Sequence, residues 1–368
     1  MYPLKEGPAF AYNQWYVGAW SHEVTRTLFE RKLLGESVVF YRDEEGRPVA
    51  MNNMCPHRKY ALSKGTLQGN AIECAYHGLT FDADGRCVRI PSQERIPSQF
   101  AVHCYPTEER WQWIWVWMGD PELADLARIP DLAWLKVNQP GWTPIVGGVE
   151  LTRARHMVLH DNLLDLSHLT HLHNRNIGSK GVAATKVTFE VIGDHMELAR
   201  HVKSDEFEHA PLGKLLDVKG LVDRTMEQQF FPPGLHVTGP AFRSAEVGGI
   251  DPGRSFGEFR VLHGVTPETA HSTHYFWGAC RDFAADDPHM SDTMRRFLKP
   301  VIGEDVDASE TVERLLQEQG DLADEISTIA DGPGMRGRRM MQELIDRDPP
   351  SLGPLRRRRT KAGDAARD

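Results

Sequence analysis

The chain lacks the marks of membrane, secreted and nucleic-acid-binding proteins. Its 368 residues contain no apolar run near the roughly 20 residues that span a bilayer, and the first residues lack a signal peptide's apolar core. It has only five cysteines, without disulfide-like spacing, and a net charge of −9 instead of a basic surplus. We therefore expect a soluble, cytoplasmic protein that binds neither membrane nor nucleic acid and is long enough for two domains.

Two further sequence features, a glycine-rich segment and a basic run near the C-terminus, are assigned no function. Gly332-Pro-Gly-Met-Arg-Gly337 fits the dinucleotide pattern G-x-G-x-x-G, but it follows the polar segment 321–329, which we expect to be helical, instead of a strand. Its proline also lacks the backbone N–H that would meet a phosphate. The basic run Arg356–Lys361 lies among Gly, Ala and Asp, and we expect residues 351–368 to form a disordered tail.

What the chain does contain is two Cys-His pairs, Cys55-Pro-His57 and Cys74-Ala-Tyr-His77. Two thiolates and two imidazoles can hold a [2Fe-2S] cluster, in which the imidazoles raise the reduction potential and allow the cluster to pass on single electrons. A structural zinc site is the alternative, because zinc also takes two Cys and two His. Zinc fingers usually pair Cys with Cys and His with His, so the mixed pairs favour the cluster.

The residues around these pairs resemble the Rieske domain. The resemblance rests on Met54-Cys-Pro-His-Arg58, on Tyr76-His-Gly78 and on the Gly85-x-Cys-Val run that ends at Ile90-Pro91. It implies that Cys55, His57, Cys74 and His77 ligate the cluster. Short β-like runs with turn residues between them, such as Val38–Tyr41 and Pro48–Met51 around Asp43–Gly46, predict an all-β domain over residues 1–125.

The sequence changes character after a proline-spaced stretch through Ile129-Pro130 and Gln139–Trp142. Strand-like segments at 186–192, 257–262 and 272–277 lie between a helix predicted over 153–172 and two helices predicted near 292–302 and 308–319. This pattern predicts an α+β domain with an antiparallel sheet over residues 126–350.

A second cluster of chemistry-bearing residues lies in the predicted helix 153–172 and just beyond it. Asp161, Asp165 and His168 are spaced to share one helical face, and His171 and His173 follow within five residues. Two histidines and one carboxylate form the facial triad of non-haem iron(II) oxygenases, whose open positions admit O₂ and substrate. His168 and His173 are the favoured pair, and His171 remains an alternative ligand.

This segment resembles the mononuclear-iron motif of Rieske oxygenase catalytic subunits, on Asn162-x-x-Asp165-x-x-His168-x-x-x-x-His173. The resemblance implies a C-terminal helix-grip (START-like) domain, iron ligation by His168 and His173, and a catalytic role for Asn162 and Asp165. Asp165 would be the carboxylate that bridges a cluster histidine and an iron-ligating histidine across a subunit boundary. A homotrimer is implied in the same way.

Local spacing does not identify the third iron ligand. By the same resemblance it belongs to a Glu-Asp pair in a C-terminal helix, and we expect Asp305, with Glu304 and Asp307 as alternatives. Asp286-Asp287 fits a turn and helix start better. Residue His263 aligns with a substrate-contacting histidine of a relative, although a strand-end residue with a satisfied hydrogen bond is an equal interpretation.

The resemblance covers nearly the whole chain and is closest to the vanillate O-demethylase and dicamba monooxygenase branch. It implies an oxygenase component that hydroxylates a small aromatic substrate, as an O-demethylase or other monooxygenase, with O₂ and electrons from a separate ferredoxin-type reductase. NAD(P)H and flavin would enter only through that reductase. A ring cis-dihydroxylating dioxygenase is the alternative enzyme, and a Rieske electron carrier with a ligand-binding domain is the non-enzymatic one.

Overall fold

A computed structural model describes residues 9–133, 135–137, 139–320 and 325–347. The chain forms two compact units, which divide between Ile129 and Pro130, close to the boundary expected at residue 125. The first contains mainly residues 8–129, and the second contains residues 130–265 and 271–344. The tail expected at 351–368 lies outside the described residues.

The first unit consists of short antiparallel strands in three small sheets. Their orders are β1-β11-β10, β2-β3-β4-β9 and β5-β6-β7-β8. The strands are β1 Gln14–Trp20, β2 Phe29–Leu33, β3 Glu36–Arg42, β4 Pro48–Asn52, β5 Thr66–Gln68, β6 Ala71–Glu73, β7 Thr80–Phe81, β8 Cys87–Arg89, β9 Cys104–Tyr105, β10 Thr107–Arg110 and β11 Trp113–Met118. The expected hairpin is present as β3 and β4.

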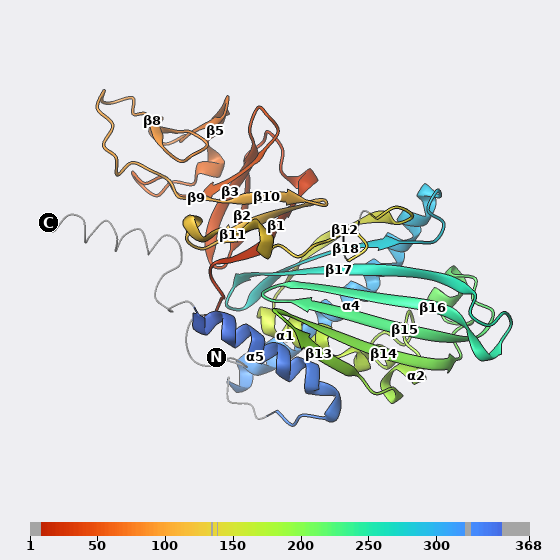
Figure 1. The fold of residues 1–368 in the computed structure, drawn as a ribbon. Helices are drawn as coiled ribbons and strands as arrows, with labels where there is room; N and C mark the ends of the chain where they lie inside the picture. The colour runs from red at the N-terminus through yellow and green to blue at the C-terminus, as the bar shows by residue number, and fades with distance from the viewer. Residues whose placement is uncertain (1–8, 134, 138, 321–324, 348–368) are drawn as a thin grey trace. The chain divides into compact units, whose positions relative to one another are not determined.

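The second unit is built on a seven-stranded antiparallel sheet in the order β12-β18-β17-β16-β15-β14-β13 (Figure 1). Its strands are β12 Thr143–Thr152, β13 Thr188–Ile192, β14 His195–Asp205, β15 Gly220–Phe231, β16 Leu235–Gly249, β17 Ser255–Thr269 and β18 Ser272–Arg281. Its helices are α1 His156–Leu164, α2 Lys180–Ala184, α3 Pro211–Leu215, α4 Pro288–Gln319 and α5 Gly332–Arg347.

Two helical expectations need correction. The helix predicted over 153–172 ends at Leu164 and is followed by a separate 3₁₀ segment, Leu166–Thr170. The two helices predicted near 292–302 and 308–319 are one helix, α4, of 32 residues. Its start follows the expected turn, because the Asp287 side chain accepts the His289 N–H. Of the segment 321–329, residues 325–328 are not helical, and residues 321–324 lie outside the described part.

Helix α4 is the element that places part of the site. Its apolar residues Met294, Leu298 and Ile302 join the buried core formed with the sheet, so the helix lies along one face of the sheet. Farther along α4, Glu313 accepts hydrogen bonds from the guanidinium of Arg155 at 2.6 and 3.1 Å. Both side chains are buried, so this ion pair fixes the start of α1 against α4.

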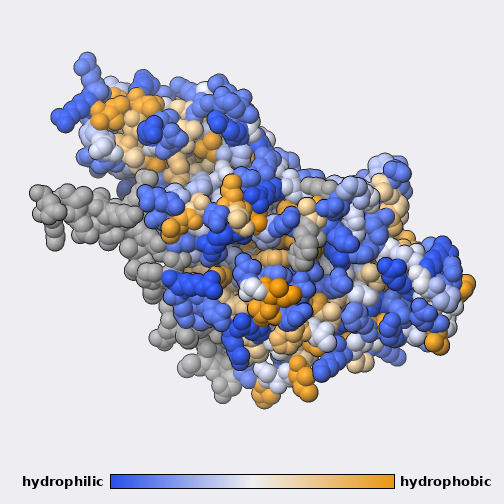
Figure 2. Space-filling view, viewed as in Figure 1, coloured by the Kyte–Doolittle hydropathy of each residue, from blue (hydrophilic) through white to orange (hydrophobic). Residues whose placement is uncertain are grey.

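Polar residues cover most of the surface that faces the viewer in Figure 2, and apolar residues form small, separate patches. In the described ranges, no helix is long and apolar enough to cross a membrane.

Candidate metal centres

The two Cys-His loops of the first unit fold alike. In each loop the cysteine N–H donates to the carbonyl five residues later, and the cysteine carbonyl accepts the N–H four residues later, at 2.8–2.9 Å. The fourth residue after each cysteine, Lys59 or Gly78, has a positive φ, of 63° and 70°. Such a turn bends the chain back so that Cys55 and Cys74 each begin a tight loop.

The four predicted cluster ligands divide into a buried and an exposed pair. Cys55 and Cys74 are buried, whereas His57 and His77 are exposed with ring centroids 4.5 Å apart. Burial, together with the neighbouring Cys74, raises the pKa of the Cys55 thiol to about 11. Two adjacent buried sulfurs lack a counter-charge unless a metal provides it, so this donor set fits a cluster whose imidazole side faces solvent.

In the second unit, the end of α1 directs the first histidine. The backbone of Asp165 leaves the helical conformation, and its carboxylate accepts the N–H and the hydroxyl of Ser167, both at 2.8 Å. This cap starts the 3₁₀ segment that carries His168. The two histidines, five residues apart, are therefore not held to the angular spacing of one α-helix.

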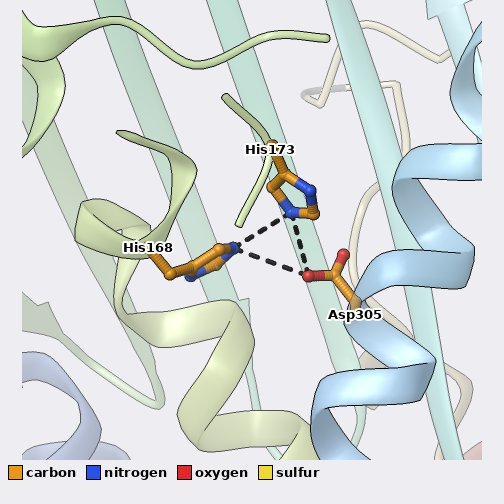
Figure 3. Close-up of side chains that lie close together, drawn as sticks. All are labelled: His168, His173 and Asp305. Atoms are coloured by element: carbon orange, nitrogen blue, oxygen red, sulfur yellow. Dashed lines mark hydrogen bonds and ion pairs between the residues drawn. The ribbon is translucent and has the colours of Figure 1, made fainter. Parts of the chain in front are cut away.

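Three side chains converge beside α4 (Figure 3). The Nε2 atoms of His168 and His173 lie 3.2 Å apart, and Oδ1 of Asp305 lies 3.5 Å from the first and 3.0 Å from the second. His173 and Asp305 are buried, and His168 is partly buried. The arrangement brings together two imidazoles and one carboxylate, as the facial triad requires.

The other nitrogen of each imidazole has its own acceptor. Nδ1 of His168 donates to the backbone carbonyl of Asp165 at 2.5 Å, and Nδ1 of His173 donates to Glu304 at 2.6 Å. Glu304 also accepts the side-chain amide of Asn176 at 3.1 Å. With the proton on Nδ1, each Nε2 directs a lone pair toward the shared centre, which is the usual arrangement around a metal.

The electrostatics of this cluster favour a cation. Burial alone would raise the pKa of Asp305, but hydrogen bonds from protons on Nε2 of His168 and His173, whose place a metal ion would take, hold that pKa well below its ordinary value. Burial would lower the pKa of His173, yet Asp305 and Glu304 raise it above its ordinary value. Both shifts show a centre that stabilises positive charge, so the donor set fits a divalent metal such as iron.

The remaining ligand candidates lie elsewhere. His171 and Asp307 are exposed, outside the group of three. Asp161, expected on one helical face with Asp165 and His168, instead accepts hydrogen bonds from Arg338 of α5 at 2.7–3.2 Å. That expectation was wrong because the helix ends between Asp161 and Asp165. The sequence suggested Glu304 only as an alternative iron ligand. In the structure, Glu304 instead accepts a hydrogen bond from the candidate ligand His173. Its position next to Asp305 was the only sign of this role in the sequence.

Asn162 and Asp165 lie on the other side of His168. They line a cavity of about 430 Å³ together with His168. The side-chain oxygen of Asn162 is buried without a hydrogen-bond partner among the described residues. Asp165 touches His168 through its carbonyl, whereas its carboxylate binds Ser167 and lies 3.5 Å from Arg200.

His263 lies within β17, not at its end, and lines a second cavity of about 90 Å³ that also reaches His168, His173 and Asp305. Its ring nitrogens contact the hydroxyls of Tyr275 (2.7 Å) and Thr238 (3.2 Å). Burial lowers the pKa of His263 to about 4, so the ring is neutral near pH 7. The residue thus has satisfied hydrogen bonds, although not at a strand end, and it also faces the cavity; its contact with a substrate stays a prediction.

Comparison with known families divides the chain in the same way. Residues 14–106 match the Rieske [2Fe-2S] domain, and residues 152–347 match the vanillate O-demethylase oxygenase C-terminal domain. The first match includes both Cys-His loops, and the second includes the two histidines and Asp305.

Similar proteins extend over almost the full chain. The iron-sulfur subunit of the toluene-4-sulfonate monooxygenase system of Comamonas testosteroni is 33% identical, over 91% of this chain and 97% of that protein. The vanillate O-demethylase oxygenase subunit of Pseudomonas sp. strain HR199 is 32% identical, over 91% and 95%. The crystal structure of dicamba monooxygenase bound to dicamba superposes with a TM-score of 0.81 at 28% identity, covering 92% of this chain and 98% of that one.

Proposed function

The chain belongs to the Rieske non-haem iron oxygenases with a vanillate O-demethylase-type C-terminal domain, and we propose that it oxidises a small aromatic substrate, most directly by O-demethylation. The observation that carries this proposal is the convergence of His168, His173 and Asp305 on a cavity beside the sheet. Relatives with this architecture are named as oxygenase components, so a separate reductase supplies the electrons.

We propose Cys55, His57, Cys74 and His77 as the cluster ligands, and His168, His173 and Asp305 as the iron ligands. When bound, the two iron centres supply electron storage and the reductive activation of O₂. The protein side chains position and insulate these centres: Glu304 and the Asp165 carbonyl fix the imidazole tautomers, and the apolar cavity walls exclude water from the substrate.

For a methoxyarene, hydroxylation converts the methyl group to a hydroxymethyl ether, one oxygen atom of O₂ entering the product and the other leaving as water. The step consumes two electrons and two protons. The hydroxymethyl ether then collapses to a phenol and formaldehyde, which needs no group from the protein.

We propose a homotrimer in which His77, an exposed cluster ligand, would pass electrons from a bound cluster toward His168 of a neighbouring copy through the Asp165 carboxylate of that copy. The exposure of His77 supports this route, as does the position of Asp165, which lines the same cavity as His168. Repeated head-to-tail interfaces form a closed ring when the rotation between neighbouring copies closes. The five cysteines, all within the described residues, form no disulfide, which fits a reducing cytoplasm.

The decisive experiment is turnover of the iron-loaded protein with NADH and a surrogate reductase. Methoxybenzoates, N-methyl compounds and arenesulfonates are supplied separately, and formaldehyde, hydroxylated products and O₂ uptake are measured together. We expect one formaldehyde for each phenol formed. A cis-diol that retains both oxygen atoms of O₂ would assign the chain to dioxygenation instead, and a cluster that cycles without substrate-dependent O₂ uptake would make it an electron carrier.

A further inference from the structure

A row of hydrogen-bonded side chains crosses the inner face of the sheet and ends at the substrate cavity. Tyr275 of β18 contacts Nδ1 of His263 on β17 at 2.7 Å, and Nε2 of His263 contacts the hydroxyl of Thr238 on β16 at 3.2 Å. Tyr275 is fully buried, whereas Thr238 is partly buried and lines the cavity with His263. The row thus has an inner end and an end that faces the substrate.

The hydrogen atoms along this row can be assigned by asking which arrangement leaves a buried donor unmatched. A neutral imidazole has one donor and one acceptor nitrogen. If His263 donated to Tyr275, the phenol O–H would be left without an acceptor among the described residues, at a fully buried position. If Tyr275 donates to Nδ1, then Nε2–H donates to Thr238, and the only O–H left over is that of Thr238.

We propose that the Thr238 hydroxyl is the hydrogen-bond donor that this cavity presents to its substrate, and that the substrate group it holds is an uncharged oxygen acceptor on an aromatic ring. Tyr275 and His263 are positioning residues in this arrangement, because they act on the substrate through Thr238. The proposal rests on the proposed oxygenase function and adds the residue and the chemical class that govern which substrate is accepted.

The charges of the described cavity wall support an uncharged group. The wall is largely apolar, and its one permanently cationic side chain is Arg224. That guanidinium donates to Asp205 and Ser179, both at 3.0 Å, and lies 4.0 Å from the ring centroid of Phe207. Its positive charge is therefore already matched, and an anionic substrate group held at Thr238 would be desolvated without a protein cation to compensate it.

One pair of probes separates an uncharged acceptor from a charged one at nearly constant shape. 4-Methoxybenzamide and 4-methoxybenzoate are titrated into the anaerobic, iron-loaded protein by calorimetry. 4-Methoxytoluene, which has a methyl group in place of the acceptor, serves as the third probe. We expect the amide to bind at least about tenfold more tightly than the carboxylate or the methyl compound.

Variants then assign the donor. Thr238→Val keeps the shape and removes the hydroxyl, and we expect it to weaken amide binding about tenfold while leaving 4-methoxytoluene unchanged. Thr238→Ser restores the donor and should bind the amide within about threefold of wild type. Tyr275→Phe removes the hydroxyl that donates to Nδ1 of His263. Nδ1 is then no longer held as the acceptor nitrogen, so the ¹⁵N shifts of the ring should show the imidazole proton moving between the two nitrogens.

Three results would overturn the proposal. Tighter binding of the carboxylate would transfer recognition to Arg224, whose buried Nε–H has no hydrogen-bond partner among the described residues. If Thr238→Val binds the amide as tightly as wild type, the Thr238 hydroxyl takes no part in substrate recognition. Failure of all three probes to bind at millimolar concentration would exclude this substrate class. If the amide binds as expected but yields no formaldehyde, the proposed reaction is wrong while the recognition stands, so the two failures are distinguishable.

Discussion

The choice of Asp305 over its neighbours as the third iron ligand can be tested by counting iron. Asp305→Asn keeps the size of the side chain and removes its charge at a position only 5% exposed. The chain should hold about three irons, two in the cluster and one in the second unit. We expect the variant to retain about two irons per chain, with the visible spectrum of the cluster unchanged.

The expected loss can be estimated from the geometry. A cation held between Asp305 Oδ1 and His173 Nε2, which lie 3.0 Å apart, would be about 3 Å or less from the carboxylate, and opposite unit charges at about 3 Å attract by about 5 kcal/mol at an effective dielectric constant of about 20. If the amide oxygen recovers half of this attraction, the remaining 2.5 kcal/mol, about half the total, weakens iron binding roughly 60-fold. Iron in the second unit is then lost on dialysis against a weak chelator, whereas the cluster is kept.

Two variants on the same helix make the test discriminating. Asp307→Asn, at an exposed residue, should bind iron like wild type. Glu304→Ala removes the acceptor for His173 Nδ1 and should weaken iron binding by about 10- to 100-fold, whereas Glu304→Gln, which keeps an oxygen there, should lose less. The assignment is refuted if Asp305→Asn keeps three irons or if Asp307→Asn drops to two.

Three further predictions address other parts of the molecule. Asp165→Asn should keep both metal centres, measured by iron content, but lose turnover; wild-type rates would exclude its bridging role. Glu313, whose folded pKa is lowered from 4.5 to about 2 mainly by hydrogen bonds that outweigh burial, stabilises the fold above pH 4.5. About 3 kcal/mol of unfolding free energy should be lost as pH falls from 4.5 to 2, and urea titrations of Glu313→Gln should lack that slope. Gly78→Ala should reduce the absorbance of the cluster, because φ at this position is +70° and the added Cβ would lie 2.9 Å from the Pro91 side chain. Gly46→Ala is the control, because φ is also positive there (+81°) but no atom lies within 4 Å of the added Cβ, and this variant should keep the cluster.

Short motifs carried most of what the sequence could predict. The Cys-His pairs and the histidine-rich segment are local, so their spacing identified both candidate centres and led to the correct family. The α+β class and the strands β3, β4, β13, β17 and β18 followed from local sequence patterns in the same way, whereas the long strands β14, β15 and β16 were not predicted. Such patterns depend only on neighbours along the chain.

What the sequence could not supply depends on contacts between distant segments. The break after Leu164 comes from one carboxylate capping a new turn, which interrupts an otherwise helical pattern. The continuous course of α4 through Pro300 reflects its packing on the sheet, since an internal proline disfavours a helix locally. The row from Tyr275 to Thr238 joins three strands and has no local signature at all.

The spread of the three converging side chains along the chain has a consequence for folding. His168 and His173 follow α1, whereas Asp305 lies on α4, 132 residues beyond His173. A metal bound at this site would close that long loop as a covalent cross-link does, and closing a loop of about 100 residues can be worth several kcal/mol. Iron would thus hold the first and last thirds of the second unit together. Removing it should release the segment around His168 to proteases and hydrogen exchange well before the sheet itself unfolds.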